Sequence, residues 1–235
     1  MTATTSVGHG QPAIDETTLF SALGTLGDIG TAAAPSRLST RLGAATSGVD
    51  DTEAHVDAQR AFIRARQLFI AGDRIDMGDL AAELGVDRTS LFRWVGNRDA
   101  LLAEVLWSLA VPTLNQVHGF VHARGAARIV GVLTGFVDAL ITAEYFRTFL
   151  RREPARALRL LTSKESEMQR RFVAVIEHLV ETETLAGTLA LPLPSREIAS
   201  LLARIVESFC YSDLITGEAP SSLRARATFD FILRT

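Results

Sequence analysis

Residues 75–102 read IDMGDLAAELGVDRTSLFRWVGNRDALL, and this stretch decides the fold. Leu80, Ala81 and Leu84 fall at i, i+1 and i+4, which puts them on one face of a helix. Gly85 follows at the position where a helix C-cap favours a residue that tolerates positive φ. The first half of the stretch therefore predicts a short helix that ends in a tight turn.

The second half of the stretch predicts another short helix and the beginning of a third. Asp87 stands where an N-cap belongs, and Leu91 and Val95 give the helix after it an inward face. Asn97 can cap the helix that follows. Two short helices around a glycine-containing turn form a helix-turn-helix unit, which presents its second helix to the DNA major groove.

The string LAAELGVDRTSLFRWVGNRDALL resembles the DNA-binding segment of the tetracycline-repressor (TetR) family. That family reads roughly L-A-x-x-L-G-V-x-x-x-T/S-L-Y-x-H-F-x-x-K-x-x-L-L. The positions that match in register, without a gap, are Leu80, Ala81, Leu84, Gly85, Val86, Ser90, Leu91, Leu101 and Leu102. The resemblance extends from the first helix to the start of the fourth, and it implies a transcriptional regulator.

The helix from Arg88 to Trp94 is the candidate reading helix. Arg88 and Thr89 lie in its first turn, where helix-turn-helix proteins contact base edges. Arginine can donate two hydrogen bonds to guanine, and the threonine methyl can pack on that of thymine. Arg93 is a further candidate for DNA contact. The alternative is a helical hairpin that never meets DNA.

The resemblance adds three more candidate DNA contacts to the reading unit. Phe92 stands where the family usually has Tyr, and Trp94 where it often has His, both at positions that face DNA in the family. Arg98 replaces a Lys that contacts phosphate, a role that a guanidinium serves well. Met77 stands where the family often has a Thr or Ser that bonds phosphate, and it cannot make that contact.

Composition and charge fit a globular DNA-binding protein. The chain has 235 residues, of which 47% are hydrophobic and 22% charged, enough for one or two domains with a sizeable core. Residues 59–98 carry seven arginines against five acidic residues, whereas residues 1–58 have a net charge of −5. The basic block contains the helix-turn-helix, as phosphate contacts require.

The sequence predicts a cytoplasmic protein without membrane spans. Its N-terminus, MTATTSVGHGQPA, lacks the basic region and apolar run of a signal peptide. The apolar stretch at 129–141 is too short to cross a bilayer. Cys210, the one cysteine, cannot form an intramolecular disulfide, and we expect a buried apolar side chain there, with redox sensing as the alternative.

We expect an all-α fold, because no run of alternating strand pattern occurs. Residues 1–55 predict an acidic, flexible N-terminal extension, with a possible short helix at 14–23. Residues 56–102 predict the helix-turn-helix DNA-binding domain, and 103–235 a helical domain for ligand binding and dimerisation. Helical periodicity gives the expected helices 56–71, 126–144, 143–152, 155–161, 195–216 and 221–234.

The regulatory domain contains a set of aromatic residues whose alternative role is ordinary core packing. By resemblance this region holds a ligand cavity, and its apolar faces suggest an apolar or amphipathic small molecule held by a few polar groups. The candidate ligand-binding residues are Phe120, Phe136, Tyr145, Phe146, Phe149, Phe172, His178, Phe209 and Tyr211, with Arg147 as a further polar candidate.

The sequence offers little for enzymatic or metal chemistry. His118 and His122 have the i, i+4 spacing that can chelate a metal, but no third ligand is near in sequence. No nucleophile elbow, phosphate loop or zinc motif is present, so we expect neither an enzyme nor a cofactor.

The resemblance also predicts the partners: a palindromic double-stranded DNA operator, a small-molecule effector and a second copy of the chain. The last two helices would form a four-helix bundle across the dimer. Effector binding would tilt the fourth helix and release the operator, which makes the protein a repressor. The C-terminal half is similar to the subgroup that regulates catabolism of lactone signals. The alternatives are an activator, or a small-molecule-binding or catalytic helical protein with a vestigial helix-turn-helix.

Overall fold

The computed structural model describes residues 36, 38, 40, 42 and 52–234, and this part of the chain is all-helical. Eleven helices, α3 to α13, follow one another here, and no strand occurs among these residues. The expected all-α fold is confirmed. The short helix predicted at 14–23 lies outside the described residues.

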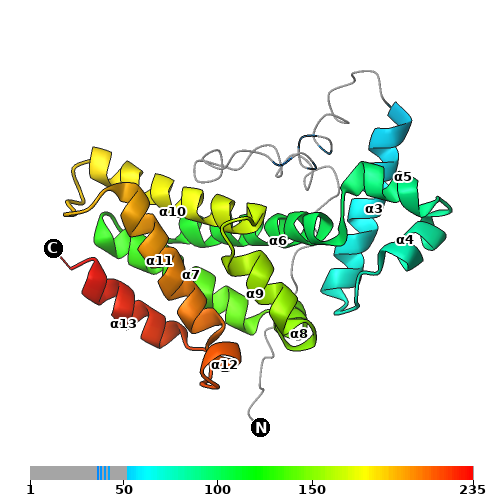
Figure 1. Cartoon of the computed structure of the whole chain (residues 1–235). Coiled ribbons are helices and arrows are strands. Elements are labelled where there is room, and N and C mark those ends of the chain that lie inside the picture. The colour runs from blue at the N-terminus through cyan, green and yellow to red at the C-terminus, as the bar shows by residue number, and fades with distance from the viewer. Residues whose placement is uncertain (1–35, 37, 39, 41, 43–51, 235) are drawn as a thin grey trace, which may run out of the picture.

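The DNA-binding part consists of α3 (Thr52–Ile70), α4 (Met77–Leu84) and α5 (Arg88–Val95), which lie together at one end of the molecule (Figure 1). Their apolar faces meet in a small core. From α3 it contains Phe62, and from α4 and α5 it contains Leu80 and Leu91, all fully buried. The three helices therefore form one packed unit that presents α5 at its edge.

Helix α6 (Arg98–Phe120) is the long arm that runs from this unit into the rest of the protein (Figure 1). It continues through Pro112. The consecutive residues 101–111 are all buried, so the helix is enclosed on every side. Its length and composition would suit a membrane span, but 67% of the apolar window is buried inside the protein, as in a core helix.

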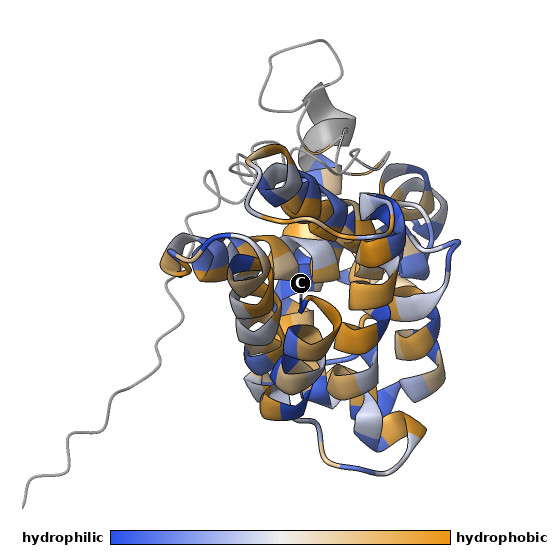
Figure 2. Cartoon of the chain, turned by 90° about the vertical axis from the view of Figure 1, so that its left-hand side faces the viewer, coloured by the Kyte–Doolittle hydropathy of each residue, from blue (hydrophilic) through white to orange (hydrophobic). Residues whose placement is uncertain are grey.

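The regulatory domain is built around the second half of α6. Its helices are α7 (Ala126–Thr142), α8 (Glu144–Arg152), α9 (Pro154–Thr162), α10 (Glu167–Leu185), α11 (Ser195–Cys210), α12 (Ser212–Ile215) and α13 (Ser222–Ile232). Figure 2 shows both hydrophobic and hydrophilic residues along the helices, as expected for amphipathic helices that pack on a common core.

Two boundaries in this domain differ from the sequence prediction. The helix expected at 195–216 is broken at Tyr211, whose backbone (φ −115°, ψ 16°) leaves the helical region between α11 and α12. The helix expected at 126–144 ends at Thr142, where α7 and α8 meet at a bend of 68°. Both breaks leave the inward periodicity of the side chains nearly unchanged, which is why the pattern alone did not indicate them.

Part of the N-terminal extension is packed. Leu38 and Leu42 are buried in the same core as the helices, at an i, i+4 spacing that turns both to one side. The Gln59 side chain of α3 donates a hydrogen bond to the Leu42 carbonyl. Both leucines therefore pack on the core at these two positions, while a flexible extension over residues 1–55 stays a prediction.

We expect Leu42→Ala to lower the free energy of unfolding by about 2–5 kcal/mol, the usual cost of removing a fully buried leucine. Thr40→Ala is the matched control, since Thr40 is exposed in the same segment, and it should change stability by less than about 0.5 kcal/mol. Urea denaturation followed by circular dichroism measures both. Equal stability of the two variants would mean that the segment does not pack on the core.

Candidate functional site

Two caps that the sequence predicted fix the turn between α4 and α5. Gly85 ends α4, and Asp87 begins the reading helix α5. Gly85 has the left-handed conformation (φ 71°, ψ 28°), and its N–H bonds back to the last turn of α4. The Asp87 carboxylate accepts from the Ser90 backbone N–H at 2.9 Å and from the Ser90 hydroxyl at 2.7 Å. The hydroxyl bond, followed by the backbone bond, lowers the pKa of Asp87. These contacts fix where α5 begins.

Helix α5 turns its apolar side inward and exposes a polar side to solvent. Leu91 and Val95 are buried, whereas Arg88, Thr89 and Arg93 are exposed. This division follows from helical geometry, since the exposed positions lie within one half of the helical circumference. Three of the predicted DNA contacts therefore share one solvent-facing side.

The two aromatic candidates of α5 differ in their surroundings. Phe92 is 36% exposed, and its ring lies 5.4 Å from the guanidinium carbon of Arg88, measured to the ring centroid. Trp94 is partly buried and packs against the hydrophobic core. Phe92 thus belongs to the exposed side of α5, whereas Trp94 offers only part of its ring to a partner.

An open groove of about 310 Å³ lies beside the reading helix. Its wall is formed by four parts of the chain: the start of α4, helix α5, the start of α6 and helix α9. The lining residues are Asp76, Met77, Arg88, Phe92, Asn97, Arg98, Asp99 and Arg156. Arg156 comes from the regulatory domain, so both parts of the chain contribute to this surface. Sequence analysis missed Arg156, because no short-range pattern connects α9 with the reading unit.

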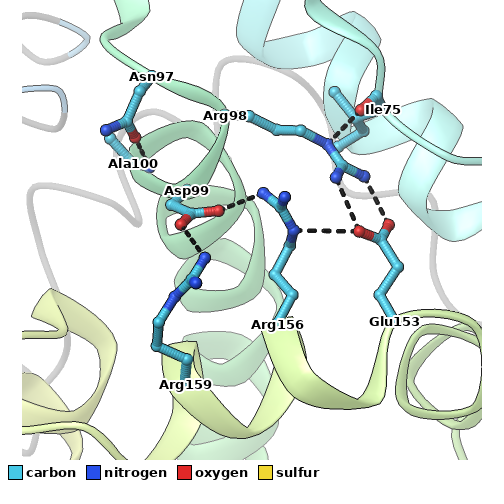
Figure 3. Close-up of polar contacts among 8 residues, drawn as sticks. All are labelled: Ile75, Asn97, Arg98, Asp99, Ala100, Glu153, Arg156 and Arg159. Carbon is cyan, nitrogen blue, oxygen red and sulfur yellow. Dashed lines mark hydrogen bonds and ion pairs between the residues drawn. The ribbon is translucent and has the colours of Figure 1, made fainter.

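Arg98, for which the resemblance implies a phosphate contact, is engaged in contacts within the protein. Its Nη1 and Nη2 atoms donate to the two carboxylate oxygens of Glu153 at 2.7 and 2.5 Å, and its Nε donates to the Ile75 carbonyl (Figure 3). The Arg98 side chain is 12% exposed and that of Glu153 19%. A guanidinium with these three contacts has few donors left for DNA.

The ion pair is part of a larger network at the junction between the two parts of the chain (Figure 3). The Arg156 Nε atom lies 3.1 Å from Glu153, and the Nη1 atom of the same guanidinium donates to Asp99. Arg159 also donates to Asp99, at 2.5 Å. The hydrogen bond from Arg98 is the main cause that lowers the pKa of Glu153. The network joins the first turn of α6 to the junction of α8 and α9.

Two small apolar cavities lie inside the regulatory domain. The first, which we call the Tyr211 cavity, is lined by Phe136, Leu140, Phe146, Leu161, Met168, Gln169, Phe172, Val206, Glu207 and Tyr211. The second, the α6 cavity, is lined by Leu106, Leu109, Ala110, Thr113, Ala139, Leu140, Tyr145, Phe146 and Met168. Five of the predicted ligand-binding residues, namely Phe136, Tyr145, Phe146, Phe172 and Tyr211, line one or the other.

The other four ligand-binding candidates line neither cavity. Phe120 is 75% exposed at the end of α6. Phe149 packs against Phe69 of α3, with ring centroids 5.3 Å apart, at the junction of the two domains. Phe209 lies beneath the guanidinium of Arg224. His178 is only partly buried on α10. Their aromatic character alone did not indicate which surface they would meet.

The remaining polar candidates have structural partners. Arg147 donates to Asp213 and, at 3.2 Å, to the Cys210 carbonyl, so it fastens α8 to the end of α11. Burial raises the pKa of the Cys210 thiol. The Nε2 atom of His118 lies 2.5 Å from the guanidinium of Arg128. Among the described residues, no group of three His, Cys, Asp or Glu side chains is arranged to hold a metal.

Sequence analysis missed the polar pair of the Tyr211 cavity. The Gln169 amide donates to the Glu207 carboxylate at 2.8 Å, and both side chains are buried. Burial raises the pKa of Glu207, while the bond from Arg204 acts in the opposite direction. The signal that could have identified the pair is its position, because polar residues rarely lie on the inward stripe of a helix.

Comparisons with known proteins agree with this architecture. Residues 124–234 match the family model described as the tetracyclin repressor-like, C-terminal domain. The fold is similar to that of the R. erythropolis transcriptional repressor QsdR, from the TetR family, with a TM-score of 0.70 and 26% sequence identity. That match covers 76% of this chain and 94% of QsdR. No curated protein matches the chain at a significant level.

We expect Glu153→Gln to lower the free energy of unfolding at pH 7 by about 2 kcal/mol, since a partly buried, charged hydrogen-bonded pair is lost. The pKa of Glu153 is lowered in the folded protein, so its contribution is fully present above the ordinary glutamate pKa of about 4.3. The contribution is lost as the pH falls through the folded-state pKa. The stability difference between wild type and variant should therefore shrink in acid.

The matched control is Glu144→Gln in the first turn of α8, the helix that ends just before Glu153. Glu144 pairs with Arg151, but its side chain is largely exposed, so the substitution should change stability little. Denaturation of all three proteins between pH 7 and pH 3 provides the comparison. A Glu153 variant that is as stable as wild type at pH 7 would contradict the structural role of the junction network.

Proposed function

Since the chain belongs to the TetR family of transcriptional regulators, we propose that it is a ligand-responsive repressor. Its dimer would bind a palindromic operator and release it when an apolar or amphipathic small molecule binds. The observation that carries this proposal is the capped helix α5, whose exposed side bears Arg88, Thr89 and Arg93. A lactone is one compound class of the proposed kind, being uncharged and amphipathic.

The proposed reading contacts follow from the chemistry of the exposed side. Arg88 and Thr89 occupy the first turn of α5, the part of a recognition helix that meets base edges. Arg88 is suited to guanine, and Phe92 to a thymine methyl or a sugar. Arg93 is assigned to a phosphate. We keep Trp94 as a secondary contact through its indole N–H.

Arg98 takes a different role in the proposal from that of a simple phosphate contact. Its bidentate pair with Glu153 ties the reading unit to the α8–α9 junction. Helices α8 and α9 also provide Phe146 and Leu161 to the wall of the Tyr211 cavity. A change in that wall can therefore reach the first turn of α6, which supports a population shift between two placements of the reading helix.

The exposed apolar side chains of α11 and α13 support dimerisation through these helices. Leu223 and Phe231 are 79% and 70% exposed on α13, and Leu201 of α11 is 40% exposed. Leu223 and Phe231 lie opposite the buried residues Ala225 and Phe229 of the same helix. The two helices lie side by side (Figure 1), so a second copy could cover both in a four-helix bundle.

The alternative is a small-molecule-binding or catalytic helical protein whose helix-turn-helix is vestigial. A gel-shift assay with DNA from upstream of the protein's own gene separates the two. The regulator predicts a sequence-specific band that weakens with salt, because phosphate contacts release counterions. Absence of such a band would favour the alternative. Promoter output with and without the gene then distinguishes a repressor from an activator.

We expect Arg88→Ala to remove most of the preference for operator over unrelated DNA, at a cost of about 1–3 kcal/mol in specific binding. Arg170→Ala on α10 is the matched control, since Arg170 is an exposed arginine far along the chain from the reading unit. Titration of both variants with operator and with scrambled DNA gives the ratio. An unchanged ratio for Arg88→Ala would remove Arg88 from the reading surface.

We expect Leu223→Glu to raise the dissociation constant of the dimer at least about tenfold, because a buried, unpaired carboxylate costs several kcal/mol. Operator affinity should fall in parallel. Leu185→Glu is the matched control, as Leu185 is equally exposed at the end of α10. Analytical ultracentrifugation measures the association state. A Leu223→Glu protein that remains fully dimeric would place the subunit interface elsewhere.

A further inference from the structure

The Tyr211 cavity and the α6 cavity are neighbours that share one wall. Leu140, Phe146 and Met168 line both of them. A methionine side chain is unbranched and flexible, so it can leave such a wall at lower cost than the leucine or the phenylalanine. Displacement of Met168 would join the two spaces into one elongated cavity between α7, α8 and α10.

The lining of the Tyr211 cavity includes three polar residues, Gln169, Glu207 and Tyr211. Tyr211 is 4% exposed, and among the described residues none forms a hydrogen bond with its hydroxyl. Burial raises the pKa of Tyr211 well above its ordinary value, so the hydroxyl remains protonated. A protonated hydroxyl can donate a hydrogen bond to an acceptor on a ligand.

The charges around the cavities select against an ionised ligand. Among the described residues, neither lining contains a basic side chain, so a buried anion would lack a counter-charge. Glu207 is the single acidic lining residue described, and its two oxygens already accept from Gln169 at 2.8 Å and from Arg204 at 2.6 Å. A cationic ligand would have to displace one of these donors.

We propose that the two cavities are halves of one effector site for an uncharged molecule with an apolar chain and one hydrogen-bond acceptor. The acceptor, such as an ester, amide or ketone oxygen, receives the Tyr211 hydroxyl proton in a hydrogen bond. The chain passes the displaced Met168 side chain and lies against α6 at Leu106, Leu109 and Ala110. This inference rests on the proposed function and specifies its ligand class.

The two cavities are too small for such an effector, so binding requires the site to expand. Each has a volume of about 30 Å³, which is room for only a few water molecules. The present conformation therefore cannot hold such an effector without expansion. A ligand that binds only the expanded form shifts the population toward that form, and the expansion would press directly on α6.

Three probes that share a ten-carbon chain test the ligand class on the full-length protein. They are methyl decanoate, which is neutral with an ester acceptor, decanoate, which is anionic, and decylammonium, which is cationic. Isothermal titration calorimetry at pH 7 should show binding of methyl decanoate at least about tenfold tighter than that of either ion. Equal or tighter binding of an ion, or no binding of the ester, would overturn the proposal.

Removal of one hydroxyl at a time tests the placement of the acceptor. Tyr211→Phe should weaken methyl decanoate binding about five- to tenfold, the usual value of one buried hydrogen bond. Thr182→Val, which removes an exposed hydroxyl of α10 that lines neither cavity, is the matched control and should bind the ester like wild type. Unchanged affinity of Tyr211→Phe, or an equal loss in both variants, would contradict the assignment of Tyr211.

Operator binding without any probe, measured on the same preparations, separates this inference from the proposed function. A protein that binds operator but prefers an ion to the ester would refute the ligand class and leave the regulator intact. A protein that binds the ester but no DNA sequence specifically would refute the regulator instead.

Discussion

The ion pair between Arg98 and Glu153 is the contact on which the relation between the two parts of the chain depends. It joins the first turn of α6 to the residue between α8 and α9, and the same guanidinium also holds the Ile75 carbonyl just before α4. A bidentate, partly buried pair fixes orientation as well as distance. The reading unit therefore cannot rotate about α6 without breaking or moving this contact.

Helix α6 is the second link between the reading unit and the regulatory domain, and its packing makes this link rigid. Its residues 101–111 are all buried, and in its second turn the Glu104 carboxylate pairs with Arg171 of α10 at 2.9 Å, with both side chains almost fully buried. The Arg171 guanidinium also lies over the ring of Trp107. Loss of one partner in such a pair leaves an uncompensated buried charge. The helix consequently moves with α10, and α10 forms one wall of both cavities.

The sequence was sufficient for the elements that depend on local rules. Gly85, Asp87 and Asn97 cap the helices as predicted, because capping needs only residues three or four positions apart. The inward residues Leu91 and Val95 follow from helical periodicity in the same way. The all-α fold and the resemblance of the reading unit to the TetR family rest on these short-range patterns.

The parts that could not be predicted depend on neighbours distant in sequence. Glu153 meets Arg98 across 55 positions of the chain. Arg156 likewise lines the groove beside α5, although it is distant from α5 in sequence. Periodicity shows that Phe149 and Phe209 face other helices, but it does not say whether those helices enclose a cavity. The packed leucines of the N-terminal extension were missed because two apolar residues make too short a pattern.

We propose that two copies of α5 read DNA together across a two-fold axis. The most direct measurement is selection of genomic fragments bound by the full-length protein, followed by hydroxyl-radical footprinting of the strongest fragment. The account predicts a palindrome whose protected half-sites lie on one face of the duplex, about 10 base pairs apart from centre to centre. Protection of a single unpaired site, or no enriched sequence at physiological salt, would contradict it.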